Sequence, residues 1–274
     1  MSRAARVLVG GLLAACAAPA AGVLDPFFVD FAPEVRSTYV SLGKIVEDAP
    51  MQTTFVRLGV DARAFGRFAL YNWNVSSLTD RRRDVHRHAI YHTEFGPTWI
   101  YGIDLADGWR LQNHAILAMT FFRGYEDPAG EGEYGWVHTE HALVNPYVTP
   151  YFYIRRCAIG SDYLHFRVGV RRWCPLGGGV YLTPAVFADG GNARDFKRVV
   201  GRNVNGGGWG GGGFSAVTFR LECGWQPTDW LTVFAYVEQY EIVGKDARDT
   251  TSASTSKCAH NDLTIGGVGL RFSF

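Results

Sequence analysis

Apolar and polar residues alternate along most of this chain. In 54–62, Val56, Leu58 and Val60 fall on one face, while Arg57 and Asp61 fall on the other. The same alternation runs through 109–122, 162–174 and 216–225. A period of two is that of a β-strand, whose successive side chains point to opposite faces. No segment after the first 22 residues keeps an apolar period of 3.6, so the pattern predicts an all-β protein.

The length of these runs indicates which kind of β protein it is. Strands of soluble proteins are usually about 5–6 residues long, whereas a tilted strand needs about 9–11 residues to cross a bilayer. Several runs here are longer than the first value and reach the second. One face of each run is apolar and the other carries charge, as in a strand between lipid and a polar lumen. We therefore predict a transmembrane, antiparallel, up-and-down β-barrel of the bacterial outer-membrane type.

The turn-forming residues between the runs divide the barrel into about twelve strands, an even number as in bacterial single-chain barrels. The strands are expected near 35–44, 51–62, 66–76, 89–104, 109–122, 134–143, 147–156, 162–174, 179–189, 213–226, 230–243 and 262–274. Long and short links should then alternate between the two ends of the barrel. The predicted links follow this rule. If the short turn at 144–146 were absent, long and short links would no longer alternate.

Aromatic residues support the same interpretation, because amphipathic rings prefer the level of the lipid headgroups. Seven of them lie at or near predicted strand ends: Trp73, Trp99, Tyr101, Trp109, Trp173, Trp225 and Trp230. Aromatics in the core of a soluble β protein would lie in mid-strand instead.

The first 22 residues have the features of a secretory signal peptide. Arg3 and Arg6 precede an apolar stretch that ends in small residues at 20–22. The alternatives are an uncleaved membrane anchor and a lipoprotein signal in which Cys16 is acylated. We expect residues 23–34 to form a short periplasmic segment and 35–274 to form the barrel. Export to the outer membrane of a Gram-negative-type bacterium follows from this arrangement.

Charge and cysteine content add two limits. The 27 basic and 26 acidic residues nearly balance, which gives no indication of nucleic-acid binding. After the leader, four cysteines remain, and an oxidising compartment permits disulfides. Cys157 and Cys258 both fall at external loops and are able to pair. Cys174 and Cys223 lie on strands that are not neighbours, which disfavours a bond between them.

Polar residues on the inward face are the candidate pore lining. The main candidates are Arg57, Asp61, His92, Glu94, Arg110, His114, His138, Glu140, Arg155, His165, Arg167, Arg171, Arg220 and Glu222. Asn72, Asn74, Tyr151, Tyr153, Glu238 and Arg271 are expected on the same face. Two interpretations stay open: a polar pore that sets solute preference, or mixed charges that pair and fill a small barrel.

A repeated tripeptide, His92-Thr-Glu94 and His138-Thr-Glu140, is the sharpest local feature. One strand separates the two copies, which places them about 10 Å apart at the usual strand spacing. Imidazole and carboxylate groups bind divalent metals, but no short-spaced ligand motif accompanies them. Pairing with neighbouring arginines is the alternative, and we assign no metal site.

Two predicted external loops have unusual composition. The segment 80–88 is rich in arginine and histidine, so it is suited to lipopolysaccharide phosphates or to attracting anionic solutes, or it is simply a solvated loop. The glycine-rich segment 206–213 lacks the Gly-Lys-Ser/Thr sequence of a phosphate loop. We expect a mobile loop there, with Trp209 near the opening.

Signatures of catalysis are absent from the sequence. It contains no Gly-x-Ser-x-Gly elbow, and no motif indicates a cofactor. We therefore assign no catalytic residues and no cofactor. A lipid-modifying enzyme of the outer membrane is kept only as a less favoured alternative.

Four segments carry a resemblance to a known family: 37–43 (STYVSLG), 145–153 (NPYVTPYFY), 182–186 (LTPAV) and 263–274 (LTIGGVGLRFSF). They resemble a family of uncharacterised bacterial outer-membrane porins. The resemblance is one of strand pattern across most of the mature chain. It implies a barrel of this size with pore activity, and no catalytic residues.

The C-terminal run, 268–274, is the most specific signal in the chain. Val268, Leu270, Phe272 and Phe274 alternate with Gly269, Arg271 and Ser273, so the first group should face lipid. A terminal Phe after alternate apolar residues resembles the signal read by the barrel-assembly machinery, although Gly267 stands where a polar residue is usual. The sequence thus predicts a channel for passive diffusion of small polar solutes, in contact with outer-membrane lipid and lipopolysaccharide. A non-conducting structural or surface-interaction barrel with a plugged lumen is the alternative.

Overall fold

A computed structural model describes residues 26–41, 44–47, 50–78, 92–122, 133–159, 162–192, 212–243, 248 and 261–274. Side chains are described in these ranges except at 39–41, 44–47, 122, 133 and 134. The expected signal peptide, the basic segment 80–88 and residues 206–211 of the glycine-rich segment lie outside the described residues, as does Cys258.

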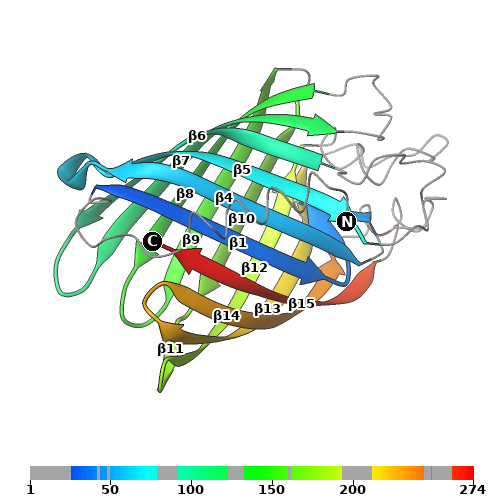
Figure 1. The fold of residues 1–274 in the computed structure, drawn as a ribbon. Coiled ribbons are helices and arrows are strands. Elements are labelled where there is room, and N and C mark those ends of the chain that lie inside the picture. Colours follow the sequence, from blue (N-terminus) through cyan, green and yellow to red (C-terminus); the bar gives the residue numbers. More distant parts are fainter. Residues whose placement is uncertain are drawn as a thin grey trace, which may run out of the picture.

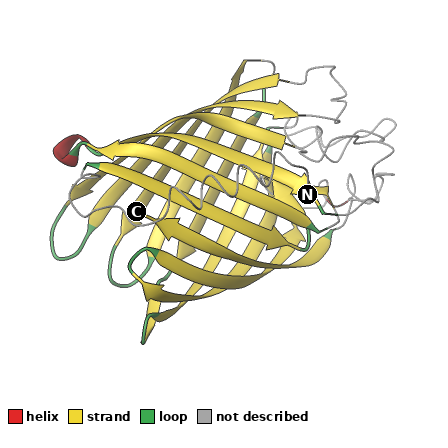
Figure 2. Ribbon diagram, viewed as in Figure 1, coloured by secondary structure: helices red, strands yellow, loops and turns green. Residues whose placement is uncertain are grey.

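Nearly all of the described chain is strand (Figures 1 and 2). The strands are β1 (Phe27–Arg36), β2 (Tyr39–Ser41), β3 (Lys44–Glu47), β4 (Met51–Asp61), β5 (Arg67–Ser77), β6 (His92–Asp104), β7 (Arg110–Phe122), β8 (Glu133–Val144), β9 (Thr149–Ile159), β10 (Leu164–Arg171), β11 (Cys174–Gly177), β12 (Val180–Gly191), β13 (Gly213–Thr228), β14 (Leu231–Ile242) and β15 (Asp262–Ser273). A 3-10 turn, η1 (Arg63–Phe65), joins β4 to β5. In the described part of the chain no helix is long and apolar enough to span a membrane.

Twelve of these strands form one closed antiparallel barrel. Each strand pairs with the next in the chain, β10 pairs with β12, and β1 pairs with β15 to close the ring. The short strand β11 follows β10 after Arg172 and Trp173 and pairs with β12. It begins at residue 174, where the predicted strand 162–174 ends. The predicted fold class and strand number are confirmed.

The two ends of the barrel differ in their links. At one end, the turn side, strands are joined by 62–66, 105–109, 145–148, 172–179 and 229–230. At the other end, the loop side, they are joined by 37–50, 78–91, 123–132, 160–163, 192–212 and 243–261. The first residue of β1 and the C-terminus both lie on the turn side (Figure 1). Five of the six loop-side links are longer than every turn-side link, as predicted, whereas the loop-side link 160–163 is as short as a turn.

The turn at 145–148, on which the alternation depends, is fixed by one asparagine. The Asn145 side-chain oxygen accepts hydrogen bonds from the backbone N–H groups of Tyr147 (3.0 Å) and Val148 (3.1 Å). Such a side chain imitates a backbone turn. The chain therefore reverses there, and β8 and β9 become neighbours.

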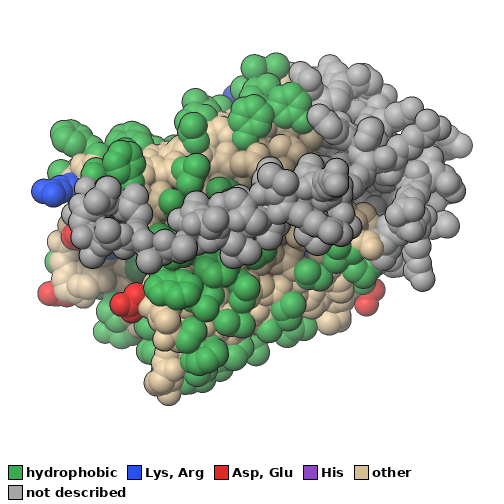
Figure 3. Space-filling model, viewed as in Figure 1, with side chains coloured by type: hydrophobic (Ala, Val, Ile, Leu, Met, Phe, Trp, Pro, Cys, Tyr) green, Lys and Arg blue, Asp and Glu red, His purple; other side chains and the backbone are tan. Residues whose placement is uncertain are grey.

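The outer face of the barrel is apolar. Large side chains such as Leu70, Phe219 and Val268 lie on it and are more than half exposed. Figure 3 shows these hydrophobic side chains spread over the barrel wall, with the few charged groups of this view near its ends. This band is the surface that a bilayer covers in barrels of this type.

The first strand differs from the prediction. It occupies Phe27–Arg36, within the segment expected to precede the barrel, rather than 35–44. Its pattern is regular, with Phe28 buried in the lumen and Phe27 exposed on the outside. Pro33 interrupts its pairing with β15, in which Ala32 and Pro33 have no partner, because proline has no N–H to donate. The barrel therefore begins in the range assigned to a periplasmic segment.

Asn72 and Asn74 were expected to face the lumen, and they do not. They alternate on β5 with Tyr71 and Val75, which are buried, and share a face with Phe68 and Leu70, which are exposed. The Asn74 amide hydrogen-bonds Asn72, and Thr93 on β6 donates to Asn74 at 2.9 Å. These three polar residues form a patch on the outer wall near its loop side.

Candidate pore lining

The structure places the predicted lining residues of the strand interiors on the lumen side of the wall, by the alternation of buried and exposed positions along each strand. They divide into three groups by depth. One group lies in the loop-side half of the lumen, one lines a cavity in the turn-side half, and Asp61 and Arg110 lie at the turn-side mouth. That these residues control the passage of solute stays a prediction.

The loop-side half of the lumen is densely packed. Tyr71, Ala118, Trp136, Cys157 and Tyr163 form a buried cluster, against which Phe55, Trp73 and Ile116 pack. On the opposite wall, the side chains of Tyr240, Ile242 and Ile265 are at most 2% exposed. Solvent is therefore nearly excluded from the described lumen side chains of this half.

Glu94 is the centre of a buried polar network in this half. Its carboxylate binds the Arg155 guanidinium at 2.7 Å and accepts hydrogen bonds from Tyr71 (2.7 Å) and Thr120 (3.0 Å). Arg155 also stacks over the Trp136 ring, 4.1 Å from its centroid. A buried charge is tolerated when it is paired and hydrogen-bonded, and this network meets both conditions.

Both histidines of the repeated tripeptide face the same carboxylate. His92 Nε2 lies 3.8 Å and His138 Nε2 lies 3.9 Å from Glu94. The two histidines are thus at similar depth, whereas Glu140 of the second copy contacts Arg171. Arg155, not a vacant coordination position, occupies the space beside Glu94, and no group of three or more potential metal ligands occurs among the described residues. The geometry favours the arginine-pairing interpretation over the metal one.

Further contacts continue the polar network along the wall. Tyr153 hydrogen-bonds His138 Nδ1 at 2.9 Å, and its ring contacts that of His165. His165 and Arg167 both bind Asp189, at 3.0 and 2.8 Å. Asp189 is fully buried, so Arg167 connects the packed half to the open half. On β7, His114 contacts Thr98 of β6 at 2.5 Å.

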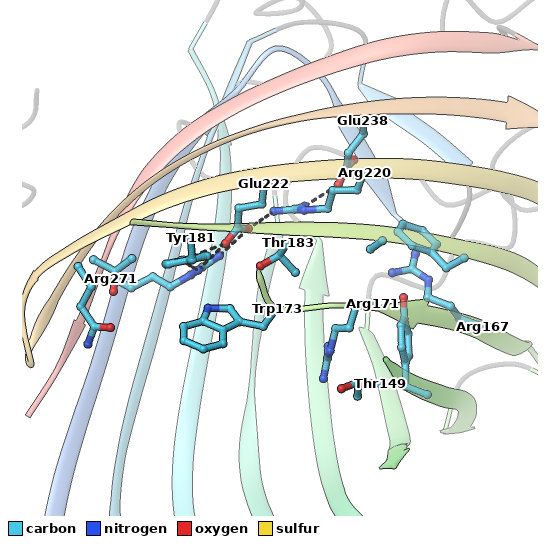
Figure 4. Close-up of a pocket in the computed structure, with 15 residues that line it drawn as sticks. Thr149, Arg167, Arg171, Trp173, Tyr181, Thr183, Arg220, Glu222, Glu238 and Arg271 are labelled. Carbon is cyan, nitrogen blue, oxygen red and sulfur yellow. Dashed lines mark hydrogen bonds and ion pairs between the residues drawn. The ribbon is translucent and has the colours of Figure 1, made fainter. Parts of the chain in front are cut away.

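A cavity of about 670 Å³ fills the turn-side half (Figure 4). Its lining is mostly polar, with four arginines, two glutamates, three threonines and several aromatic rings. The lining residues include Thr149, Tyr151, Arg167, Arg171, Trp173, Tyr181, Thr183, Arg220, Glu222, Thr232, Glu238 and Arg271. Trp173 and Gln226 are exposed, so solvent reaches the cavity from the turn side.

Most of the charge in the cavity is paired. Arg271 binds both oxygens of Glu222, at 2.8 and 2.9 Å, and Arg220 binds Glu222 at 2.8 Å and Glu238 at 2.5 Å (Figure 4). Arg171 is held less tightly, with one contact to Glu140 at 3.4 Å. Positively and negatively charged side chains therefore lie next to one another on neighbouring strands of the lumen wall.

The remaining candidates lie nearer the turn side or on the closing seam. The Asp61 carboxylate accepts a hydrogen bond from the Arg63 backbone at 2.8 Å, so it serves the turn rather than the lumen centre. Arg110 is exposed, 3.5 Å from Asp104. Arg57 pairs with Asp30 on β1 at 2.7 Å.

Sequence reasoning missed several lumen residues, among them two acids of β1, one acid of β12 and one tryptophan. Asp30 and Glu34 alternate regularly with Phe27, Val29 and Phe31, a signal that was present within the segment assigned to the periplasm. Asp189 and Trp173 lie at strand ends next to predicted links. The alternation of Tyr181, Thr183 and Phe187 along β12 could have identified Asp189 as a lumen residue.

Comparisons with known proteins bear on the fold alone. No family model and no curated protein matches the chain. Among solved structures, an outer-membrane channel from Pseudomonas putida F1 is similar with a TM-score of 0.51 and 11% identity, over 91% of this chain and 96% of that one.

Two other porin structures give weaker scores. The KdgM porin has a TM-score of 0.47 and 9% identity, over 90% of this chain and 99% of that one. The NanC porin has a TM-score of 0.47 and 8% identity, over 89% and 98%. At these identities, the comparison with the Pseudomonas putida channel shows a shared fold: this chain has the architecture of an outer-membrane β-barrel.

Proposed function

We propose that the protein is a porin-like channel of the bacterial outer membrane that lets small polar solutes diffuse passively. The observation that carries the proposal is the polar, solvent-reached cavity of about 670 Å³ inside a closed barrel. A lumen lined by paired charges and hydroxyls replaces part of the hydration of a polar solute. The apolar outer band supports a position in a bilayer.

The partners of this proposal follow from its surfaces. Outer-membrane lipid and lipopolysaccharide would cover the apolar wall, and small polar solutes would occupy the lumen. The C-terminal segment ending at Phe274 resembles the signal read by the barrel-assembly machinery, which is the partner proposed for it. No catalytic residue, metal, cofactor or nucleic acid belongs to the proposal.

A second candidate function has one observation in its favour. The Glu94–Arg155 pair and the packed aromatic cluster fill the loop-side half of the lumen. A barrel blocked at this level would be a structural or surface-interaction protein. The two candidates differ in whether ions cross the packed half, which conductance measures directly.

The test compares two adjacent positions on β14. Thr232 lines the cavity, while Val233 is exposed on the outer wall. Purified protein in planar bilayers should give reproducible conductance steps. Thr232→Trp should lower the step size because it narrows the lumen, and Val233→Trp should leave it unchanged. Absence of any steps from folded wild-type protein rejects the channel and favours the blocked barrel.

A further inference from the structure

One arginine of the turn-side cavity is set apart by its weak pairing. We propose that this cavity binds a small carboxylate carried on a six-membered ring, with Arg171 holding the carboxylate and Trp173 covering the ring. The inference rests on the proposed function, because it names the class of solute that the lumen takes up, but binding can be measured without conduction. The same chemistry occurs in sugar acids and in aromatic acids.

The charge of the cavity favours an anion. Four arginines and two glutamates line it. Arg220 and Arg271 are neutralised by those two glutamates, Glu222 and Glu238. Arg167 is neutralised by Asp189, which is buried above the cavity. The positive charge of Arg171 is therefore the one least balanced within the cavity.

The pair between Arg171 and Glu140 is loose. Its one contact is 3.4 Å long, and the two side chains are 40% and 31% exposed. Exposed ion pairs contribute little to stability. A guanidinium has five N–H donors in a planar fork that fits a carboxylate in two places at once. Arg171 can therefore exchange this contact for a bidentate one with a solute.

One aromatic ring lies under the same guanidinium, and a second lines the same cavity two residues further along the chain. Arg171 lies over the Tyr151 ring at 5.1 Å, which orients the fork. Trp173, two residues further along, is 62% exposed and contacts the Tyr181 ring at 6.1 Å. Figure 4 shows both side chains in the cavity lining. An exposed indole beside an arginine offers a flat face to a ring whose carboxylate is bound next to it.

The remaining lining suits a small, hydroxylated or flat molecule. Thr149 and Thr183 supply hydroxyl groups beside Arg171 and Glu222. A volume of about 670 Å³ is within the range of sites for small molecules. Access is from the turn side, so the solute reaches Arg171 without crossing the packed half.

Titration calorimetry on the full-length protein in detergent tests the inference. D-glucuronate and benzoate are the two carboxylate probes, and D-glucose is the neutral control. Arg171→Gln should weaken carboxylate binding about tenfold or more, since it removes a charge-assisted pair. Trp173→Ala should weaken it as well. Arg110→Gln is the matched control, because Arg110 is also exposed and loosely paired but lies outside the cavity.

Binding of glucuronate alone identifies sugar acids, and binding of benzoate alone identifies aromatic acids. The inference is overturned if neither carboxylate binds, if glucose binds equally well, or if Arg171→Gln and Arg110→Gln have the same effect. Far-UV circular dichroism verifies that each variant is folded, and Arg171→Lys, which keeps the charge without the fork, should fall between wild type and Arg171→Gln. Carboxylate binding without conductance rejects the channel alone, whereas conductance without binding rejects this inference alone.

Discussion

Arg155 on β9 binds Glu94 on β6 at 2.7 Å, across the two strands that separate them in the wall. The contact links residues 61 positions apart. It joins two walls of the lumen at the level of the packed aromatic cluster, where both side chains are at most 7% exposed. The pair therefore holds the narrow half of the barrel in shape.

Breaking this pair should destabilise the barrel. Arg155→Met leaves the Glu94 carboxylate buried without its cation, which typically costs about 3–5 kcal/mol. The free energy of unfolding in urea, measured in detergent micelles by tryptophan fluorescence, gives the value. Arg110→Gln, which breaks an exposed pair, should change it by about 1 kcal/mol or less.

The double variant Arg155→Met, Glu94→Gln should recover part of the loss, because no unpaired charge remains buried. Equal unfolding free energies for wild type and Arg155→Met would contradict the role of the pair.

Adjacent glycines of β15 should respond oppositely to an added methyl group. A Cβ at Gly267, on the lumen side, would overlap the Tyr236 ring, whereas a Cβ at Gly266, on the outer side, meets nothing within 4 Å. We expect Gly267→Ala to cost about 1–3 kcal/mol through overpacking. Gly266→Ala should be neutral or stabilising by about 0.5–1 kcal/mol, since glycine weakens a strand. The same urea unfolding measurement distinguishes them, and similar effects at both positions would refute the assigned faces.

An added charge should lower the free energy of unfolding more on the outer wall than in the lumen. Leu221 is in the middle of β13 and is 45% exposed on the outside. In a bilayer, Leu221→Arg should cost about 2–4 kcal/mol, as arginine does near the midplane. Thr183→Arg places the same charge in the lumen, opposite Glu222 in register, and should cost less. The comparison requires unfolding from lipid vesicles, and a larger loss for Thr183→Arg would argue against membrane insertion in this orientation.

Phe274 should contribute more to the yield of inserted barrel in cells than to refolding into detergent in vitro. Phe274 stacks on Trp230 at 5.8 Å, and its backbone exchanges two hydrogen bonds with Val29. Phe274→Ala keeps the backbone bonds, so refolding into detergent should be nearly unchanged. If the residue is read by the assembly machinery, its replacement lowers the yield of inserted barrel in the outer membrane.

Phe272→Ala is the control for this experiment, because Phe272 stacks on Phe31 and Trp230 but is not terminal. Equal yields for both variants would mean that Phe274 acts only through packing.

The alternation of side chains was enough to predict the barrel, its strand number and the faces of most strands, because lipid on one side and a polar lumen on the other impose a strict period of two. The alternation was not enough to place β1. That strand begins directly after the expected leader and contains Pro33, which is unusual within a paired strand. Asp30, the partner of Arg57, was missed together with it.

Side-chain partnerships within the lumen could not be predicted in the same way. Whether Glu94 meets Arg155 or a nearer residue depends on the register of three successive strand pairs, which a one-residue slip would change. Likewise, the repeated tripeptide showed that His92 and His138 have similar depth. It could not show that Arg155 occupies the space beside Glu94.

The packed loop-side half and the hollow turn-side half give the lumen the form of a one-sided funnel. In a conduit of uneven width, an applied voltage falls mainly across the narrowest and least hydrated stretch. If ions cross this barrel as proposed, the field is expected to concentrate around Glu94, with a wide antechamber in front of it on the turn side alone. Such a channel should rectify: equal voltages of opposite sign should drive unequal currents.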